Sequence, residues 1–155
     1  MLRLFKRKKN IRPMMLEDFT GQDNAKTLLK VAINGAKSRK DVLDHTVIYG
    51  PPGLGKTTLA GIIANEMNTK LITSIGTSLQ KQSDIVDLFD DIYRDDTLFI
   101  DEIHRIPARL EELLYTAMED GYIDLGSRSM DIPRFTLIGA TTRLGDLSEP
   151  LRERF

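Results

Sequence analysis

The chain has 155 residues, of which 41% are hydrophobic and 29% charged, and its formal net charge is −1. This is the composition of an ordinary globular domain, long enough for a single hydrophobic core. The absence of cysteine excludes a disulfide framework, a thiolate zinc site and a cysteine nucleophile, and it fits a cytoplasmic protein. No apolar run approaches the roughly 20 residues that span a bilayer, so we expect no membrane-bound state.

The N-terminal segment, residues 1–10, differs in charge from the rest of the chain. It contains five basic residues and no acidic one, whereas acidic residues outnumber basic ones in the remainder. This distribution argues against a basic nucleic-acid-binding surface over the whole domain. We expect residues 1–10 to form a flexible basic arm and residues 11–155 to form one domain.

Hydrophobic periodicity predicts an amphipathic helix over residues 22–36. Its apolar face consists of Ala25, Leu28, Leu29, Ala32, Ile33 and Ala36. A short strand (45–50), a turn rich in glycine and proline, and a helix (56–67) follow. The later pattern predicts a strand (70–75), a helix (83–93), a strand buried on both faces (97–100), a helix (108–120), a hairpin (122–132) and a last buried strand (135–139).

The predicted helix over 108–120 has a marked division between its faces. Leucines, Ala117 and Met118 form the inward face, and Glu111, Glu112 and Glu119 are expected to point outward. Strands that alternate with helices at these lengths predict an α/β fold, in which a parallel sheet lies between two helical layers.

A phosphate-binding loop is predicted between the first strand and its helix. Its glycines let the backbone approach phosphate, and the N–H groups of the loop and of the helix N-terminus converge on the anion. Lys56 would bridge the outer phosphates of ATP or ADP, and the Thr57 hydroxyl would ligate Mg²⁺. The residues assigned to this loop are Gly50, Pro51, Pro52, Gly53, Leu54, Gly55, Lys56, Thr57 and Thr58.

Two adjacent carboxylates, Asp101 and Glu102, end the third predicted strand. An aspartate at this position can hold Mg²⁺ through water, and the following glutamate can act as general base for the water that attacks the γ-phosphate. The alternative is that the pair caps the next helix through its dipole. We interpret His104 as a helix-start or packing residue.

Polar residues near the C-terminus supply candidates for further roles. A hydroxyl at the end of the last strand can sense the γ-phosphate or the attacking water, and Thr142 is the first candidate, with Thr141 second. Arg152 and Arg154 lie far along the chain from the phosphate loop, where they could serve a neighbouring subunit in trans. The alternative is that these arginines belong to a solvated chain end.

Taken together, these motifs resemble the AAA+ ATPases, and among them the RuvB family of bacterial Holliday-junction branch-migration motors. The resemblance covers residues 11–155. It is carried by IRP (11–13), FTGQ (19–22), LDH (43–45), YGPPGLGKTTLA (49–60), LFIDEIHR (98–105), MED (118–120), FTLIGATTR (135–143) and PLRERF (150–155).

The resemblance implies an AAA+ fold and an ATP-driven DNA motor in recombination and repair. It assigns the adenine pocket to Arg12, Pro13, Phe19 and Thr20, and it makes Arg154 the arginine finger given to a neighbouring subunit. It also implies a hexameric ring that acts on duplex DNA with a junction-binding partner protein.

Two departures from the family pattern restrict these expectations. The family hairpin that contacts the junction-binding partner is longer than residues 121–132, so that contact is not carried over to this chain. The family also continues into a fifth strand, a helical lid and a winged-helix domain that touches DNA. We therefore expect a sheet that ends one strand early, with the phosphate-loop strand at its edge.

The sequence is also compatible with two other functions. One is a non-catalytic nucleotide-binding module that assembles with a full-length homologue, for which the missing lid is the argument. The other is a small P-loop kinase. Glu102 argues against a kinase, because phosphoryl transfer to an acceptor other than water does not need a water-activating glutamate.

Overall fold

Four parallel strands form the central sheet of the computed structural model, which describes residues 14–155. The spatial order of the strands is β1 (Thr46–Tyr49), β6 (Thr136–Thr141), β3 (Thr97–Asp101) and β2 (Leu71–Ile75). The predicted α/β fold with a parallel sheet is confirmed. Residues 1–10, together with Arg12 and Pro13, lie outside the described residues.

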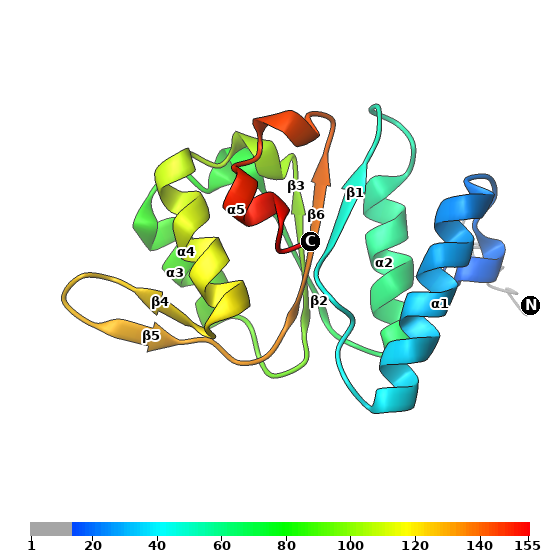
Figure 1. Ribbon diagram of the computed structural model, residues 1–155, viewed down its shortest axis with the longest axis horizontal. Coiled ribbons are helices and arrows are strands. Elements are labelled where there is room, and N and C mark those ends of the chain that lie inside the picture. The colour runs from blue at the N-terminus through cyan, green and yellow to red at the C-terminus, as the bar shows by residue number, and fades with distance from the viewer. Residues whose placement is uncertain (1–13) are drawn as a thin grey trace, which may run out of the picture.

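Helices cover both faces of this sheet (Figure 1). The helices α1 (Asp23–Arg39) and α2 (Lys56–Met67) lie on one side, and α3 (Gln82–Asp90), α4 (Ala108–Glu119) and α5 (Glu149–Arg152) on the other. Side chains of β3 alternate between the two cores, since Leu98 and Ile100 pack with α3 and α4 whereas Phe99 packs with α1 and α2. All three are buried, as predicted for a strand covered on both faces.

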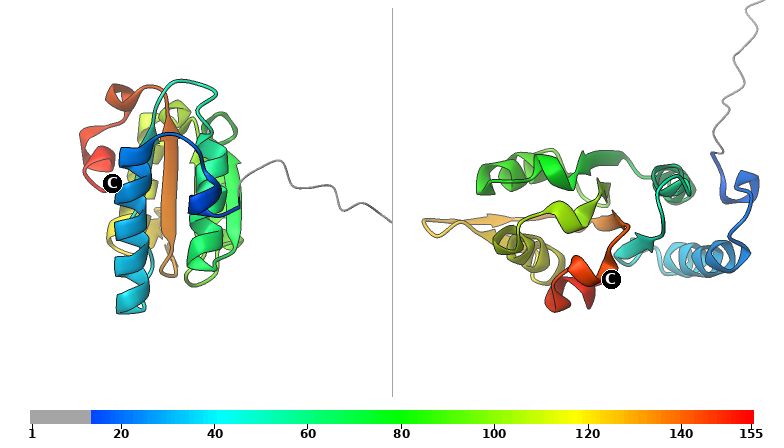
Figure 2. Two further views of the ribbon diagram at one scale, coloured as in Figure 1. Left: turned by 90° about the vertical axis from the view of Figure 1, so that its right-hand side faces the viewer. Right: turned by 90° about the horizontal axis from the view of Figure 1, so that it is seen from above.

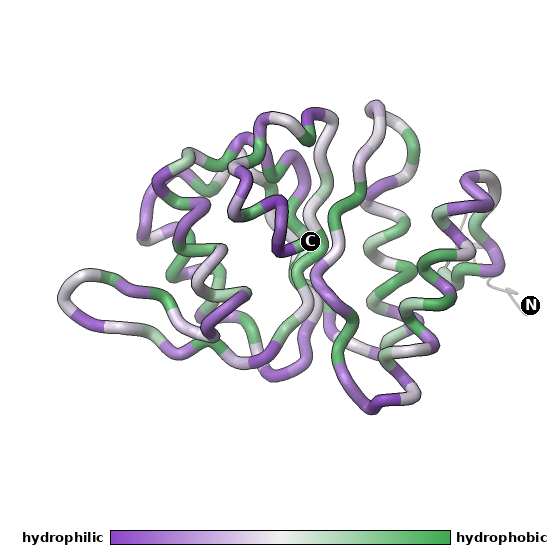
Figure 3. Tube along the Cα trace, viewed as in Figure 1, coloured by the Kyte–Doolittle hydropathy of each residue, from purple (hydrophilic) through white to green (hydrophobic). Residues whose placement is uncertain are grey.

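Hydrophobic residues lie along the strands and the helix faces next to them, and hydrophilic residues fill the turn after α1 (Figure 3). The antiparallel pair β4 (Tyr122–Asp124) and β5 (Ser129–Asp131) forms the predicted hairpin, with Gly126 at positive φ in its turn. Figure 2 shows this hairpin extending from one end of the molecule, opposite α1. No helix in residues 14–155 is long and apolar enough to cross a membrane.

Short 3₁₀ helices follow three of the parallel strands close to their carboxyl ends. They are η2 (Gly76–Ser78) after β2, η3 (Ile103–Arg105) after β3 and η4 (Leu144–Asp146) after β6, and η1 (Leu16–Asp18) precedes α1. Because all four strands are parallel, η2, η3, η4 and the loop after β1 gather where the carboxyl ends of the strands lie.

The structure corrects several details of the predicted helices. On α1, Leu28 is 71% exposed and Ala32 is also exposed, because only Leu29, Ile33 and Ala36 reach the core. Helix α1 continues to Arg39, and α3 ends at Asp90, before the predicted end at residue 93.

A larger error concerns Glu111, which was predicted to point outward and is only 3% exposed. Its Oε2 accepts a hydrogen bond from the backbone N–H of Ser148 at 3.0 Å. The segment that leads into α5 covers this face of α4, and helical periodicity cannot anticipate a covering element 37 residues away in sequence.

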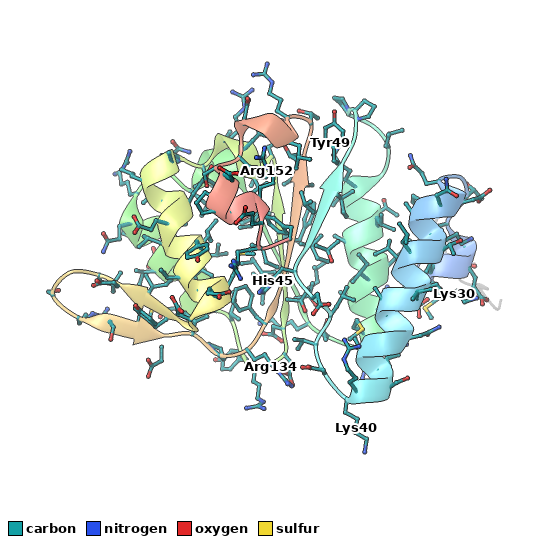
Figure 4. The ribbon with its side chains drawn as sticks, viewed as in Figure 1. Lys30, Lys40, His45, Tyr49, Arg134 and Arg152 are labelled. Carbon is teal, nitrogen blue, oxygen red and sulfur yellow. The ribbon has the colours of Figure 1, made fainter. Side chains whose placement is uncertain are left out.

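The phosphate-loop strand β1 lies at the edge of the described sheet, as expected. Its one partner there is β6, with Tyr49 opposite Thr141. Tyr49, labelled at the end of β1 in Figure 4, is 64% exposed.

Candidate nucleotide site

The loop between β1 and α2 has the backbone geometry of a phosphate-binding loop. Gly53 and Gly55 have φ values of 83° and 76°, which side chains with a Cβ adopt only at a cost. Gly55 is the N-cap of α2, so the first N–H groups of that helix open toward the loop.

Lys56 lies across this loop. Its Nζ donates hydrogen bonds to the carbonyl oxygens of Gly50 at 3.0 Å and Pro51 at 2.9 Å. The ammonium group is thereby held beside the opening formed by the glycines, and the carbonyls are neutral partners that an anionic ligand can outcompete.

A pocket of about 660 Å³ joins this loop to the ends of β3 and β6. It is lined by Pro52, Gly53, Gly55, Lys56, Thr57, Thr58, Ile75, Asp101, Glu102, Thr141 and Thr142. The structure therefore brings most of the predicted phosphate site together. Strand β6 lies between β1 and β3, so the threonines come between the loop and the acidic pair.

The two carboxylates differ in backbone environment. Oδ1 of Asp101 accepts a hydrogen bond from the Glu102 N–H at 2.9 Å, which fixes the turn after β3. Glu102 is left-handed, with φ 46° and ψ 46°, a conformation that is rare for a residue other than glycine. Such strain is typical of functional sites.

The threonines at the end of β6 have different partners. Thr141 is buried; its Oγ1 accepts a hydrogen bond from the Arg143 N–H at 2.9 Å and lies 2.8 Å from Nδ1 of His104. Thr142 lines the pocket and is half-buried. His104 does lie in the short helix η3, as expected, but its bond to Thr141 was not predicted.

Mg²⁺ requires few protein ligands in such a site. Within residues 14–155, no group of three or more histidines and carboxylates could hold a metal ion. A magnesium ion bound with nucleotide keeps several waters and takes one or two protein oxygens. The Thr57 hydroxyl and the Asp101 carboxylate, which line the same pocket, fit that need.

A second pocket of about 370 Å³ lies beside the loop, between α1 and β1. Its lining is mostly apolar and includes Phe19, Leu28, Tyr49 and Leu54, as well as Lys56. A Cβ on Gly55 would lie 3.5 Å from the Phe19 ring, so this pocket adjoins the phosphate loop directly.

Of the predicted adenine-pocket residues that the structure describes, Phe19 lines this pocket, whereas Thr20 is exposed and is not part of the lining. Sequence reasoning missed Lys26. Its Nζ donates to the carbonyl oxygen of Phe19 at 2.9 Å and of Glu17 at 3.3 Å, which ties the segment before α1 to that helix.

The terminal arginines do not line the phosphate pocket. Arg154 forms an ion pair with Glu119, and its guanidinium lies 5.3 Å from the centroid of the Tyr115 ring. Its Nε is buried without a hydrogen-bond partner. Arg152, labelled on α5 in Figure 4, is exposed.

Comparison with known proteins identifies the family. Residues 11–155 match the model of the Holliday junction DNA helicase RuvB P-loop domain. The chain is 50% identical over 157 residues to the Holliday junction branch migration complex subunit RuvB of Phytoplasma mali, covering 96% of this chain and 47% of that protein. The corresponding subunit of Lacticaseibacillus casei is 52% identical over 155 residues, with 95% and 46% covered.

Solved structures agree with these sequence relationships. A point mutant of Thermotoga maritima RuvB superposes with a TM-score of 0.88 at 52% identity, covering 94% of this chain and 47% of that one. The Thermotoga maritima RuvB Holliday junction branch migration motor gives a TM-score of 0.83 at 51% identity, with 93% and 46% covered. The chain spans about half the length of the relatives it matches, and it belongs to the RuvB family of P-loop proteins.

Proposed function

We propose that this chain binds ATP with Mg²⁺ and hydrolyses it as the motor core of a Holliday-junction branch-migration helicase. One observation carries the proposal: a single pocket contains the phosphate loop, the Asp101–Glu102 pair and Thr142. The names of the relatives, which are branch migration subunits and motors, support the larger role.

Nucleotide binding uses the loop and the pocket beside it. The N–H groups at the start of α2 and the Lys56 ammonium hold the phosphates, and Lys56 exchanges its loop carbonyls for phosphate oxygens. The adenine base enters the apolar pocket beside Phe19. Thr57, directly, and Asp101, through a water molecule, would hold Mg²⁺, and the ion would neutralise phosphate charge.

Hydrolysis requires a water molecule in line with the γ-phosphate. Glu102 takes a proton from that water as general base, and Thr142 orients the water or the γ-phosphate. Arg154 of one copy stabilises the transferring phosphoryl group of a neighbouring copy, with Arg152 as the second candidate, since neither arginine lines the phosphate pocket of its own chain. The active form is therefore a ring of several copies. That the ring acts on DNA is supported by the names of the relatives.

Ligand-dependent thermal stability tests nucleotide binding. Saturating MgATP raises the melting temperature of the chain because it binds only the folded state. Lys56→Ala abolishes this increase, whereas Lys30→Ala, at an exposed lysine of α1 labelled in Figure 4, retains it. An equal MgATP-dependent increase in Lys56→Ala would contradict the assignment of the phosphate loop.

Phosphate release tests the chemistry. Glu102→Gln retains the MgATP-dependent stabilisation and loses turnover, because the amide cannot accept the proton of water. An unchanged rate would refute the role of Glu102. Binding of ATP without release of phosphate by the unsubstituted chain, at any protein concentration, would instead favour a non-catalytic module.

A further inference from the structure

Gly76 and Glu102 occupy equivalent positions at neighbouring strand ends. Strands β2 and β3 pair in parallel, with Ile75 opposite Asp101. Gly76 is therefore the first residue after β2, and Glu102 is the first residue after β3. The two residues meet where these strands leave the sheet. This places the first residue of η2 against the candidate general base.

The approach between the two residues leaves no room for a side chain at position 76. A Cβ on Gly76 would lie 2.2 Å from the carbonyl oxygen of Glu102 and 3.2 Å from Cβ of Arg105. The first distance is far below any contact that a real Cβ makes. Gly76 does not have a positive φ, so the close approach, rather than its backbone conformation, requires glycine here.

The Glu102 carbonyl cannot turn away freely from such a side chain. It accepts the hydrogen bond from the Arg105 N–H at 2.8 Å that starts η3, and the Glu102 N–H is bound to Asp101. The residue is also in the left-handed region, which the surrounding contacts must stabilise. A displacement of the carbonyl therefore changes the direction of the Glu102 side chain.

Gln80 reinforces this contact from the other side. Its Nε2 donates to the carbonyl oxygen of Gly76 at 3.0 Å and of Arg105 at 3.4 Å, bridging η2 and η3. The backbone carbonyl oxygen of Gln80 accepts a hydrogen bond from Nη2 of Arg109 at 2.7 Å. The two segments are thus held together by side chains that lie outside the phosphate pocket.

We propose that Gly76 is a positioning residue for Glu102: its missing side chain allows the backbone approach that aims the general base at the attacking water. The inference rests on the proposed function of Glu102. It adds that the segment after β2 sets the hydrolytic rate without contributing to nucleotide affinity.

The test compares Gly76→Ala with a matched control, Gly61→Ala, since a Cβ on Gly61 meets nothing within 4 Å. Phosphate release at saturating MgATP and the MgATP dissociation constant are measured for both. We expect Gly76→Ala to lower kcat by about 10- to 100-fold, as a misplacement near 1 Å does. Its dissociation constant stays within about twofold of the unsubstituted value, and Gly61→Ala retains both.

A crystal structure of Gly76→Ala supplies a second readout that does not depend on activity. We expect the Glu102 carbonyl and carboxylate to be displaced while residues 50–58 keep their positions. An unmoved Glu102, or a kcat equal to that of Gly61→Ala, would overturn the proposal. A parallel loss of kcat, affinity and melting temperature would do so as well, since it would mark a structural role only.

If Gly76→Ala does not fold, Gln80→Ala replaces it, because Gln80 is exposed and its removal only loosens the contact. We expect a several-fold lower kcat with unchanged affinity, and an unchanged kcat overturns the proposal. Glu102→Gln separates the two levels of inference. Turnover that survives Glu102→Gln refutes the proposed function, whereas turnover lost there and retained in Gly76→Ala refutes the positioning role alone.

Discussion

The Nδ1 atom of His104 lies 2.8 Å from the hydroxyl oxygen of Thr141, a contact that joins the segment after β3 to the end of β6. The two residues are neighbours of the functional candidates, since His104 is two positions after Glu102 and Thr141 immediately precedes Thr142. The same hydroxyl also accepts the Arg143 N–H at 2.9 Å. One hydrogen-bonded unit therefore joins the segment that carries Glu102, the proposed general base, to the segment that carries Thr142, the proposed sensor.

Replacing His104 is expected to slow hydrolysis more than it weakens nucleotide binding. His104→Ala removes a hydrogen bond of about 1 kcal/mol between the two segments, which corresponds to a roughly fivefold lower kcat if the loss falls on the transition state. His104→Asn is the control, because its amide can still reach Thr141. Steady-state kinetics check the result, and an equal loss in both variants would contradict the role of the hydrogen bond.

The buried carboxylate of Glu111 gives a second prediction, on stability. Glu111→Ala leaves the Ser148 N–H without its acceptor at the start of α5, which costs about 1–3 kcal/mol of unfolding free energy. Glu112→Ala, at the exposed neighbouring position, is expected to change stability by less than about 0.5 kcal/mol. Urea unfolding of both variants checks this, and similar midpoints would contradict it.

Glu111 also illustrates what the sequence could and could not predict. The parallel sheet, the helix over Lys56–Met67 and the phosphate loop were predictable, because hydrophobic periodicity and the glycine–lysine spacing are local signals. The contacts of Glu111, His104 and Gly76 join segments 26 to 37 residues apart in sequence, so no local pattern reports them. The outward orientation predicted for Glu111 was wrong for this reason.

The stability of the chain is expected to depend on pH through His45. Its Nδ1 accepts the Leu137 N–H at 2.9 Å, so the ring is neutral in the fold, and burial lowers the pKa of His45 below its usual value. The unfolded chain therefore binds more protons than the folded chain between that lowered pKa and about 6.5. The contribution of neutral His45 to the unfolding free energy is fully present above about pH 6.5 and is lost as the pH falls through this window.

His45→Gln isolates this contribution, because the amide oxygen can accept the same N–H but does not titrate. We expect the unfolding free energy of the unsubstituted chain to decrease more between pH 7.5 and pH 5.5 than that of the variant. Chemical denaturation at both pH values measures the difference. Equal decreases in the two proteins would show that His45 is not the titrating group.

The trans role proposed for Arg154 can be tested by mixing two inactive variants. Arg154 is bound to Glu119 and Tyr115 in its own chain, so it must exchange these partners for a neighbour's phosphate. We expect Lys56→Ala to lose nucleotide binding and Arg154→Ala to lose the proposed arginine finger, a group that contributes about 10³- to 10⁵-fold in rate where it acts. In mixed assemblies, an intact Lys56 site can face an intact Arg154, and phosphate release is expected to reappear with a maximum at intermediate ratios.

Arg152→Ala in place of Arg154→Ala is the matched control and is expected to be active by itself. The absence of recovery at every ratio would contradict action in trans.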